Sequence, residues 1–149
     1  MKYKIRLARK GDIPEMLRIA KQNWLGEDAW IKRPDFEKIL KSNPKTCWVM
    51  EIGGKIAGVR LVRDDFEHRI RGYLLMVRPE YRREGYGTIL FNETNRILKG
   101  LGYRCLVGET GVDNSPSIKW HKKVGYKVLC KASGWFFDDS DALLFYYRL

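Results

Sequence analysis

The chain has 149 residues, a length typical of a single domain with a core of its own. Hydrophobic residues make up 44% of it, which argues against disorder, and no apolar run approaches the roughly 20 residues of a membrane span. The start of the chain lacks the continuous apolar stretch of a signal peptide, so we expect a soluble cytoplasmic protein.

The formal net charge is +11, with lysine and arginine spread along the whole chain. Charge of this sign attracts nucleic acid, an acidic membrane surface or a phosphorylated cofactor. No block of five or six like charges occurs, so a solvated basic surface is the preferred explanation and a nucleic-acid partner the next.

Cysteines and histidines give no sign of a metal site. Cys47, Cys105 and Cys130 form no CxxC pair, and each lies in an apolar, strand-like run, so we expect reduced core cysteines. His68 and His121 stand far apart without an acidic cluster around them. We therefore predict no bound metal.

The N-terminal part reads as a strand followed by two helices. Residues 2–9 alternate between apolar and charged side chains, as in a half-buried strand. Asp12, with Glu15 three residues on, resembles a capping box at the start of a helix that Gly26 closes. The apolar face of this helix is formed by Ile13, Met16, Leu17, Ala20 and Trp24. Residues 35–40 form a short second helix after Pro34; residues 27–33, with Trp30, are a simple connection or a substrate-facing loop, the former slightly preferred.

Three strands follow. Residues 46–52 are β-branched and aromatic, Gly53-Gly54 is typical of a hairpin turn, and residues 55–63 continue as a strand with Ile56, Val59, Leu61 and Val62. Asp64-Asp65 predicts the next turn, and residues 68–77 the next strand.

The C-terminal part reads as helix, strand, helix and two strands. Asn114-Ser115-Pro116 is typical of a helix start and Gly125 of its end. Trp135-Phe136-Phe137 form a lid or belong to the core at a strand end. The expected elements are a helix over 89–101, a strand over 103–107, a helix from 114 to 125, and strands over 126–131 and 142–149.

The loop between the strand ending at Val77 and the helix that follows carries the first functional motif. It holds Arg82, Arg83, Gly85, Gly87 and Thr88 where a helix begins, and helix N-termini with glycines suit an anion such as a pyrophosphate. It lacks the GxxxxGK[ST] pattern of a P-loop, and Leu90 stands where a dinucleotide fingerprint has its third glycine.

A second constellation lies in residues 114–126. Asn114, Ser117 and His121 are spaced three and four apart, so they share one helical face that suits a polar, extended ligand.

Together the two segments resemble the GNAT (GCN5-related) N-acetyltransferase family. Arg82-x-x-Gly85-x-Gly87 looks like that family's pyrophosphate loop, and residues 114–126 look like its second acyl-CoA segment. The resemblance covers nearly the whole chain and implies one GNAT domain over residues 1–149. The implied fold is α/β (α+β), with a mixed, mostly antiparallel sheet of about seven strands and helices on both faces. Its order of elements is strand, helix, helix, three strands, helix, strand, helix, two strands. The residues it implies for binding acetyl-CoA are Leu75, Met76, Val77, Arg82, Arg83, Gly85, Tyr86, Gly87, Thr88, Asn114 and Ser117.

The resemblance also implies direct acetyl transfer from acetyl-CoA to a primary amine. The N–H of Val77 would stabilise the oxyanion, and His121 would protonate the departing sulfur where the family often has tyrosine. Glu109 is the first candidate for the base, acting directly or through water, with Asp113 and Tyr73 as weaker candidates.

The acceptor stays open among a small molecule, a peptide or protein amine, and an aminoacylated RNA. Two other classes compete with the enzyme: a basic nucleic-acid-binding domain without chemistry, and a CoA-binding regulatory domain without turnover. The family's sheets are often extended between subunits, so a homodimer also stays open.

Overall fold

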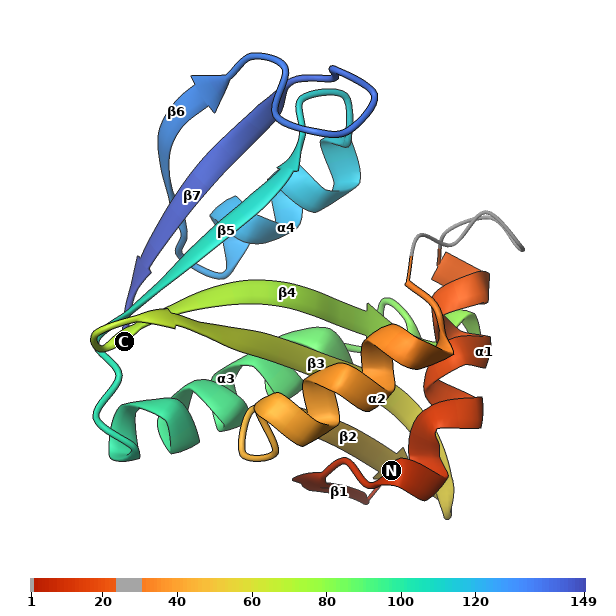
Figure 1. Cartoon of the computed structure of the whole chain (residues 1–149). Helices are drawn as coiled ribbons and strands as arrows, with labels where there is room; N and C mark the ends of the chain where they lie inside the picture. Colours follow the sequence, from red (N-terminus) through yellow and green to blue (C-terminus); the bar gives the residue numbers. More distant parts are fainter. Residues whose placement is uncertain (1, 24–30) are drawn as a thin grey trace. The chain divides into compact units, whose positions relative to one another are not determined.

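The computed structural model describes residues 2–23 and 31–149 (Figure 1). The strands are β1 (Tyr3–Leu7), β2 (Cys47–Ile52), β3 (Lys55–Phe66), β4 (Arg69–Val77), β5 (Cys105–Gly111), β6 (Lys127–Ala132) and β7 (Ala142–Arg148). The helices are α1 (Ile13–Asn23), α2 (Arg33–Ser42), α3 (Tyr86–Gly100) and α4 (Ser115–Lys123), with short 3-10 turns η1 (Lys10–Asp12) and η3 (Pro79–Tyr81). This order of strands and α-helices confirms the predicted one.

The strands are hydrogen-bonded in the order β1-β2-β3-β4-β5-β7-β6. The pair β4–β5 is parallel, whereas β1–β2, β2–β3, β5–β7 and β6–β7 are antiparallel. The predicted α/β fold with a mixed, mostly antiparallel sheet of seven strands is therefore confirmed.

The chain folds into two compact units, described separately below. Unit 1 comprises Met1–Arg63 and Tyr73–Ile97, and unit 2 comprises Asp64–Gly72 and Leu98–Leu149. That residues 1–149 act as one domain stays a prediction.

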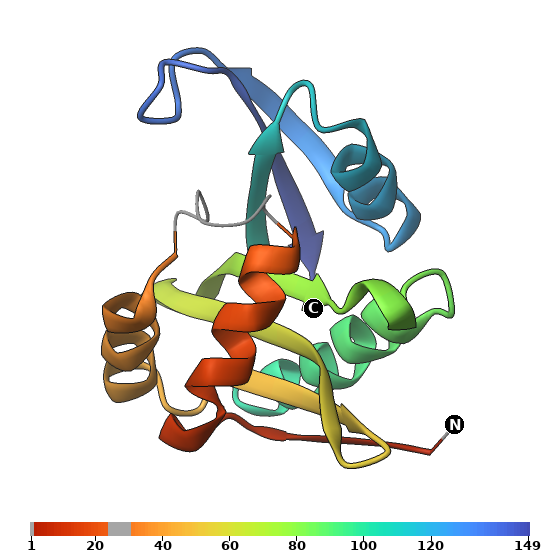
Figure 2. The same ribbon diagram turned by 90° about the vertical axis from the view of Figure 1, so that its right-hand side faces the viewer.

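In unit 1 the strands are covered on both faces (Figure 2). One face packs on α1 and α2 through a buried cluster that includes Met16, Phe36 and Val49. The other face packs on α3 through a cluster that includes Met50 and Leu90. Val49 and Met50 are neighbours on β2 and serve opposite faces, as the two-residue period of a strand requires.

A buried arginine fixes α3 on β3 within unit 1. Arg60 is 2% exposed, and its guanidinium donates to the Phe91 carbonyl at 2.7 Å and to Asn95 Oδ1 at 2.7 Å. It also donates to the Thr94 hydroxyl and lies 4.7 Å from the centroid of the Phe91 ring. Hydrogen bonds to a buried charge are costly to break, so they hold the helix in register on the sheet.

In unit 2, α4 lies along one side of strands β5, β6 and β7 (Figure 2), and the buried side chains include Leu106, Tyr126 and Phe145. β5 pairs with β7 along its whole length, from Cys105 opposite Arg148 to Gly111 opposite Ala142. The first residues of β4, Arg69–Arg71, extend this sheet by pairing with β5.

The turn between β3 and β4 is not where the sequence placed it. Asp64 and Asp65 lie inside β3, and the turn falls on Glu67 and His68, which both have positive φ. Asp64 accepts a hydrogen bond from the Tyr103 hydroxyl at 2.9 Å, and Asp65 lies 3.9 Å from the Arg71 guanidinium. These partners let two aspartates remain in a strand that their composition disfavours.

The strand β5 and the helix α3 are also longer than predicted. β5 continues past Val107 to Gly111, because Glu109 and Thr110 keep pairing with β7 although they are polar. α3 begins at Tyr86, three residues before the first periodic apolar residue, Ile89.

Two predictions of burial were wrong in part. Cys47 and Cys105 are buried as expected, but Cys130 is exposed on the edge strand β6. Trp135 is 41% exposed and Phe137 is fully exposed, so these two rings are not core residues. The predictions about Trp24, Gly26 and Trp30 concern residues outside the described part of the chain.

Candidate acyl-CoA site

In unit 1 the predicted anion loop lies between β4 and the start of α3. The backbone has positive φ at Arg83 (65°) and at Gly85 (84°), and α3 starts at Tyr86 directly afterwards. Gly87 and Thr88 thus belong to the first helical turn, where the N–H groups have no partner within the helix. The helix dipole adds a partial positive charge there, so the loop and turn are chemically suited to a phosphate.

The start of α3 is held against β4 by apolar contacts. Tyr86 is buried in the same cluster as Val77 and Leu90, and its ring meets the Tyr81 ring edge-on at 6.2 Å between centroids. A Cβ at Gly87 would lie 3.5 Å from Leu75 Cδ2. The loop therefore sits on a packed base, which fixes the direction in which its N–H groups point.

The side chain of Arg82 is already ordered by neutral partners. Nε donates to the Val77 carbonyl at 3.0 Å, and Nη2 donates to Asn23 Oδ1 at 2.9 Å and to the Gln22 carbonyl at 3.5 Å. Gln22 and Asn23 belong to the last turn of α1. Arg82 and Arg83 are both exposed.

The end of β4 shows which way the backbone of Val77 points. The N–H of Arg78 donates to the Ala57 carbonyl on β3 at 2.8 Å. Since backbone groups alternate along a strand, the N–H of Val77 points to the side away from β3. Met76 is buried in the core facing α1 and α2, and Leu75 contacts Gly87. The eight predicted residues from Leu75 to Gly87 therefore lie along the chain from the last residues of β4 to the first turn of α3.

Arg78, which the sequence did not single out, anchors this strand end. It is 9% exposed, donates through Nε to the Ile56 carbonyl at 2.6 Å, and forms an ion pair with Glu15 of α1. The sequence feature that could have indicated Arg78 is its position as a charged residue directly after the apolar run that ends at Val77. Asn23 was also missed, and no local signal marks it, since its partner Arg82 is 59 residues away.

In unit 2 the predicted residues of α4 occupy the start and the buried side of the helix. Asn114 is the N-cap: its side chain accepts from the N–H of Ser117 at 3.2 Å, which confirms the predicted helix start. Pro116 falls in the first turn, as expected. The cap uses the amide oxygen of Asn114 and leaves its NH₂ group as the donor for a ligand.

His121 is held tightly between α4 and the sheet of unit 2. Its ring stacks on Phe145 at 4.7 Å between centroids and with planes 16° apart, and it meets Tyr126 at 5.0 Å. Nδ1 lies 2.8 Å from the Ser117 carbonyl, which can only accept, so this nitrogen carries the proton and Nε2 of the neutral ring carries the free electron pair. Burial lowers the pKa of His121 below its ordinary value, which the Ser117 hydrogen bond only partly offsets.

Glu109, the first candidate base, lies within β5 rather than after it. Its carboxylate is 3.5 Å from the Arg71 guanidinium. A Cβ at Gly108 would lie 3.5 Å from His121 Nε2, so Gly108 faces α4 and the side chain of Glu109 points to the opposite face of β5. The structure of unit 2 thus places the two predicted catalytic side chains on different faces of one strand.

The weaker base candidates belong to different units. Asp113 is exposed before α4, and the ring of Tyr73, on the part of β4 that belongs to unit 1, lies 5.3 Å from the Arg63 guanidinium.

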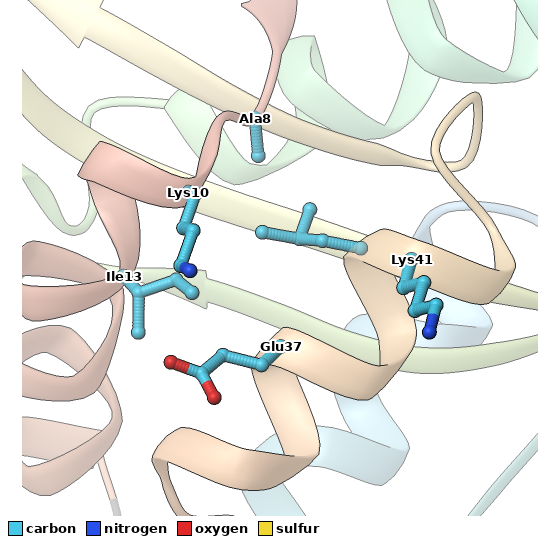
Figure 3. A pocket seen from close by; sticks show the side chains of 6 residues that line it. Ala8, Lys10, Ile13, Glu37 and Lys41 are labelled. Atoms are coloured by element: carbon cyan, nitrogen blue, oxygen red, sulfur yellow. The ribbon is translucent and has the colours of Figure 1, made fainter.

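A separate depression of about 410 Å³ lies in unit 1 between η1, α1 and α2 (Figure 3). Lys10 and Ile13 line one side of it, and Glu37 and Lys41 project from α2 on the other. It contains none of the predicted site residues, so we place the candidate site at the strand end and loop, where the chemistry suits an anion.

Two further classes of site were searched for in the described residues. Among them, no group of three or more His, Cys, Asp and Glu side chains could hold a metal ion. Over the same residues, none of the helices has both the length and the apolar composition needed to cross a membrane.

Residues 13–126 match the acetyltransferase (GNAT) family. This match spans most of the chain, so the protein belongs to that family, as the sequence motifs predicted. An N-alpha-acetyltransferase of Sulfurisphaera tokodaii is 27% identical, with 95% of this chain and 90% of that protein covered. An N-acetyltransferase of Methanocaldococcus jannaschii, itself uncharacterised, is 24% identical over 89% of this chain. The aligned region covers only 64% of that relative's length.

Solved structures with the same fold include Ard1 from Thermoplasma volcanium, with a TM-score of 0.89, 19% identity and coverage of 100% of this chain and 99% of that one. The ribosomal-protein-S18-alanine N-acetyltransferase of Escherichia coli has a TM-score of 0.83 at 17% identity, covering 99% and 94%. A chain of the NatC complex bound to Gag peptide and CoA also scores 0.83, at 14% identity and coverage of 100% and 99%. At these identities the structures establish the fold.

Proposed function

We propose that the protein is an acetyl-CoA-dependent N-acetyltransferase whose acceptor is the α-amino group of a peptide or protein. The observation that carries the proposal is the loop from Arg82 to Thr88, which presents a helix N-terminus, a positive-φ glycine and two arginines at the end of β4. Family membership supports acyl transfer from an acyl-CoA to an amine.

The loop would hold the pyrophosphate of the donor. N–H groups of the first turn of α3 and the hydroxyl of Thr88 would donate to it, and Arg82 and Arg83 would supply charge-assisted hydrogen bonds. The thioester would lie beside Met76 and Val77, with the Val77 N–H directed at the carbonyl oxygen as negative charge develops there.

The transfer itself breaks the carbon–sulfur bond of the thioester and forms a carbon–nitrogen bond to the acceptor. The amine must give up a proton to a base, and the departing sulfur must gain one. We propose His121 for the proton delivered to sulfur and Glu109, directly or through water, for the proton taken from the amine. His121, on α4, and the side chain of Glu109 lie on opposite faces of β5, which fits separate routes for the two protons.

The identity of the acceptor is supported by the relatives. The Sulfurisphaera tokodaii relative is named an N-alpha-acetyltransferase, and it aligns along 95% of this chain. Of two proteins with the same fold, one is named a ribosomal-protein-S18-alanine N-acetyltransferase, and the other, in the NatC complex, was solved bound to Gag peptide and CoA. These names favour an N-terminal amine over a free small amine.

Calorimetry with acetyl-CoA tests the donor site. We expect micromolar binding by the unmodified protein and a large loss of affinity in Gly85→Trp. Changing both Arg82 and Arg83 to alanine should weaken binding at least tenfold, because charge-assisted hydrogen bonds contribute roughly 1.5–3 kcal/mol each. Gly54→Trp is the matched control, because Gly54 also has positive φ and lies in open space in the β2–β3 turn. Unchanged affinity in both loop variants would refute the pyrophosphate assignment.

Product analysis tests the acceptor. A library of short peptides with free N-termini should be acetylated at the α-amino nitrogen, and the same peptides with blocked N-termini and free lysines should not. Acetylation of lysine side chains, of small amines or of aminoacylated RNA in preference to peptide N-termini would overturn the acceptor class. Acetyl-CoA binding without any product would instead indicate a regulatory domain.

A further inference from the structure

The amide side chain of Asn23 links the end of α1 to the candidate pyrophosphate loop. Asn23, the last residue of α1, donates through Nδ2 to the Ile19 carbonyl at 2.8 Å and approaches the Val77 carbonyl at 3.5 Å. Its Oδ1 accepts from Arg82 Nη2 at 2.9 Å. One side chain therefore joins the last turn of α1, the last residue of β4 and the loop arginine.

The partners of Arg82 among the described residues are uncharged. Its hydrogen bonds to them go to two backbone carbonyls and one amide oxygen. Among the described residues, no carboxylate lies within ion-pair distance of Arg82, and no acceptor lies within hydrogen-bond distance of its Nη1. The described contacts thus fix the direction of the guanidinium through Nε and Nη2 by means of neutral acceptors, which do not offset its positive charge.

We propose that Asn23 is a positioning residue that orients Arg82 toward the donor pyrophosphate without neutralising it; this rests on the proposed function. An amide suits that task because it accepts a hydrogen bond and carries no charge. A carboxylate at the same place would form an ion pair with Arg82 and compete with the phosphate. The positioning lowers the cost of ordering a long, flexible side chain when the anion binds.

The test compares two substitutions at this position. Asn23→Asp is nearly the same size as the native residue and converts the neutral acceptor into a competing anion. We expect it to weaken acetyl-CoA binding about tenfold, with the loss shrinking as salt screens the new charge. Asn23→Ala removes the acceptor without adding charge and is expected to weaken binding about threefold, since an ordinary hydrogen bond contributes roughly 0.5–1.5 kcal/mol.

Two measurements separate positioning from a structural role. The first is S-acetylpantetheine, a thioester donor without pyrophosphate: its KM should be the same for the native protein and for Asn23→Asp. The second is a double-mutant cycle with Arg82→Ala, in which Asn23→Asp should have little further effect on acetyl-CoA affinity. Asn92→Asp is the control for net charge, because Asn92 is exposed on α3 in the same unit.

The outcomes distinguish this inference from the proposed function. If the unmodified protein binds no acetyl-CoA, the proposed function fails. If it binds, but the losses from Asn23→Asp and Arg82→Ala are additive, or S-acetylpantetheine suffers equally, Asn23 does not position Arg82.

Discussion

Replacing His121 by tyrosine tests whether the imidazole of His121 is the acid that protonates the leaving sulfur. Nδ1–H is engaged by the Ser117 carbonyl, so the neutral ring has only an electron pair at Nε2. Donation from Nε2 therefore requires the imidazolium. Because burial lowers the pKa of His121 below its ordinary value, the imidazolium is the minor form in neutral and alkaline solution.

A tyrosine hydroxyl keeps its proton up to about pH 10, so the two side chains differ most in alkaline solution. If His121 protonates the leaving sulfur, the kcat of the native protein divided by the kcat of His121→Tyr should fall about tenfold per pH unit above 6.5. Both values are measured at saturating acetyl-CoA. The assay is kcat from pH 5.5 to 10, expressed as the ratio of the two proteins so that ionisation of the acceptor amine cancels.

His68→Asn serves as the control, because it removes the other histidine at a positive-φ position that asparagine tolerates. A ratio that is flat with pH, or a His121→Phe variant with the native profile and full turnover, would refute the assignment of His121 as the acid.

Three further predictions concern stability. The pKa of His121 is lowered in the folded state, so below about pH 6.5 the unfolded chain binds more protons than the folded protein. The free energy of unfolding should therefore fall as the pH drops through this range. In urea titrations, His121→Phe should make the free energy of unfolding depend less steeply on pH. A Cβ at Gly58 would lie 3.2 Å from the Met76 carbonyl oxygen, so Gly58→Ala should destabilise the protein by about 1–3 kcal/mol. Gly100→Ala is the control, because Gly100 has open space around it and the substitution should not destabilise the protein. Equal urea midpoints for the two variants would contradict this prediction. Asn114→Ala removes the cap of α4 and should cost about 1 kcal/mol, seen as a decrease of roughly 2–4 °C in Tm, and Asn114→Asp should restore it.

The elements that sequence predicted well are those whose signals are local. The Gly53-Gly54 turn between β2 and β3, and the start of α4 at Asn114 and Pro116, depend on backbone preferences of a few adjacent residues. The helix start after Gly85 is of the same kind, since the glycines and arginines of the proposed pyrophosphate loop are contiguous with it. Motifs of this type are readable without knowledge of the fold.

The features that sequence missed depend on residues far apart in the chain. Asp64 and Asp65 read as a turn because their partners, Tyr103 and Arg71, lie on other segments. No pattern in the sequence around Asn23 indicates its hydrogen bond to Arg82, which lies 59 residues further along the chain.

The orientation of Glu109 likewise could not be read from spacing. It follows from the length of β5, which pairing with β7 extends beyond its apolar residues. Once Glu109 lies inside a regular strand next to Gly108, its side chain must point to the face opposite His121.

The way in which the chain alternates between its two units has a consequence for any attempt to dissect the protein. The chain enters unit 2 after Arg63, leaves it after Gly72 and returns after Ile97, so neither unit is a continuous segment. A fragment starting at Leu98 would lack Arg69–Arg71 and would expose the pairing edge of β5, which invites aggregation. Splitting the gene between the units would therefore yield two incomplete sheets. Only a rearranged chain order, with the segment 64–72 rejoined to the C-terminal part, could produce unit 2 alone.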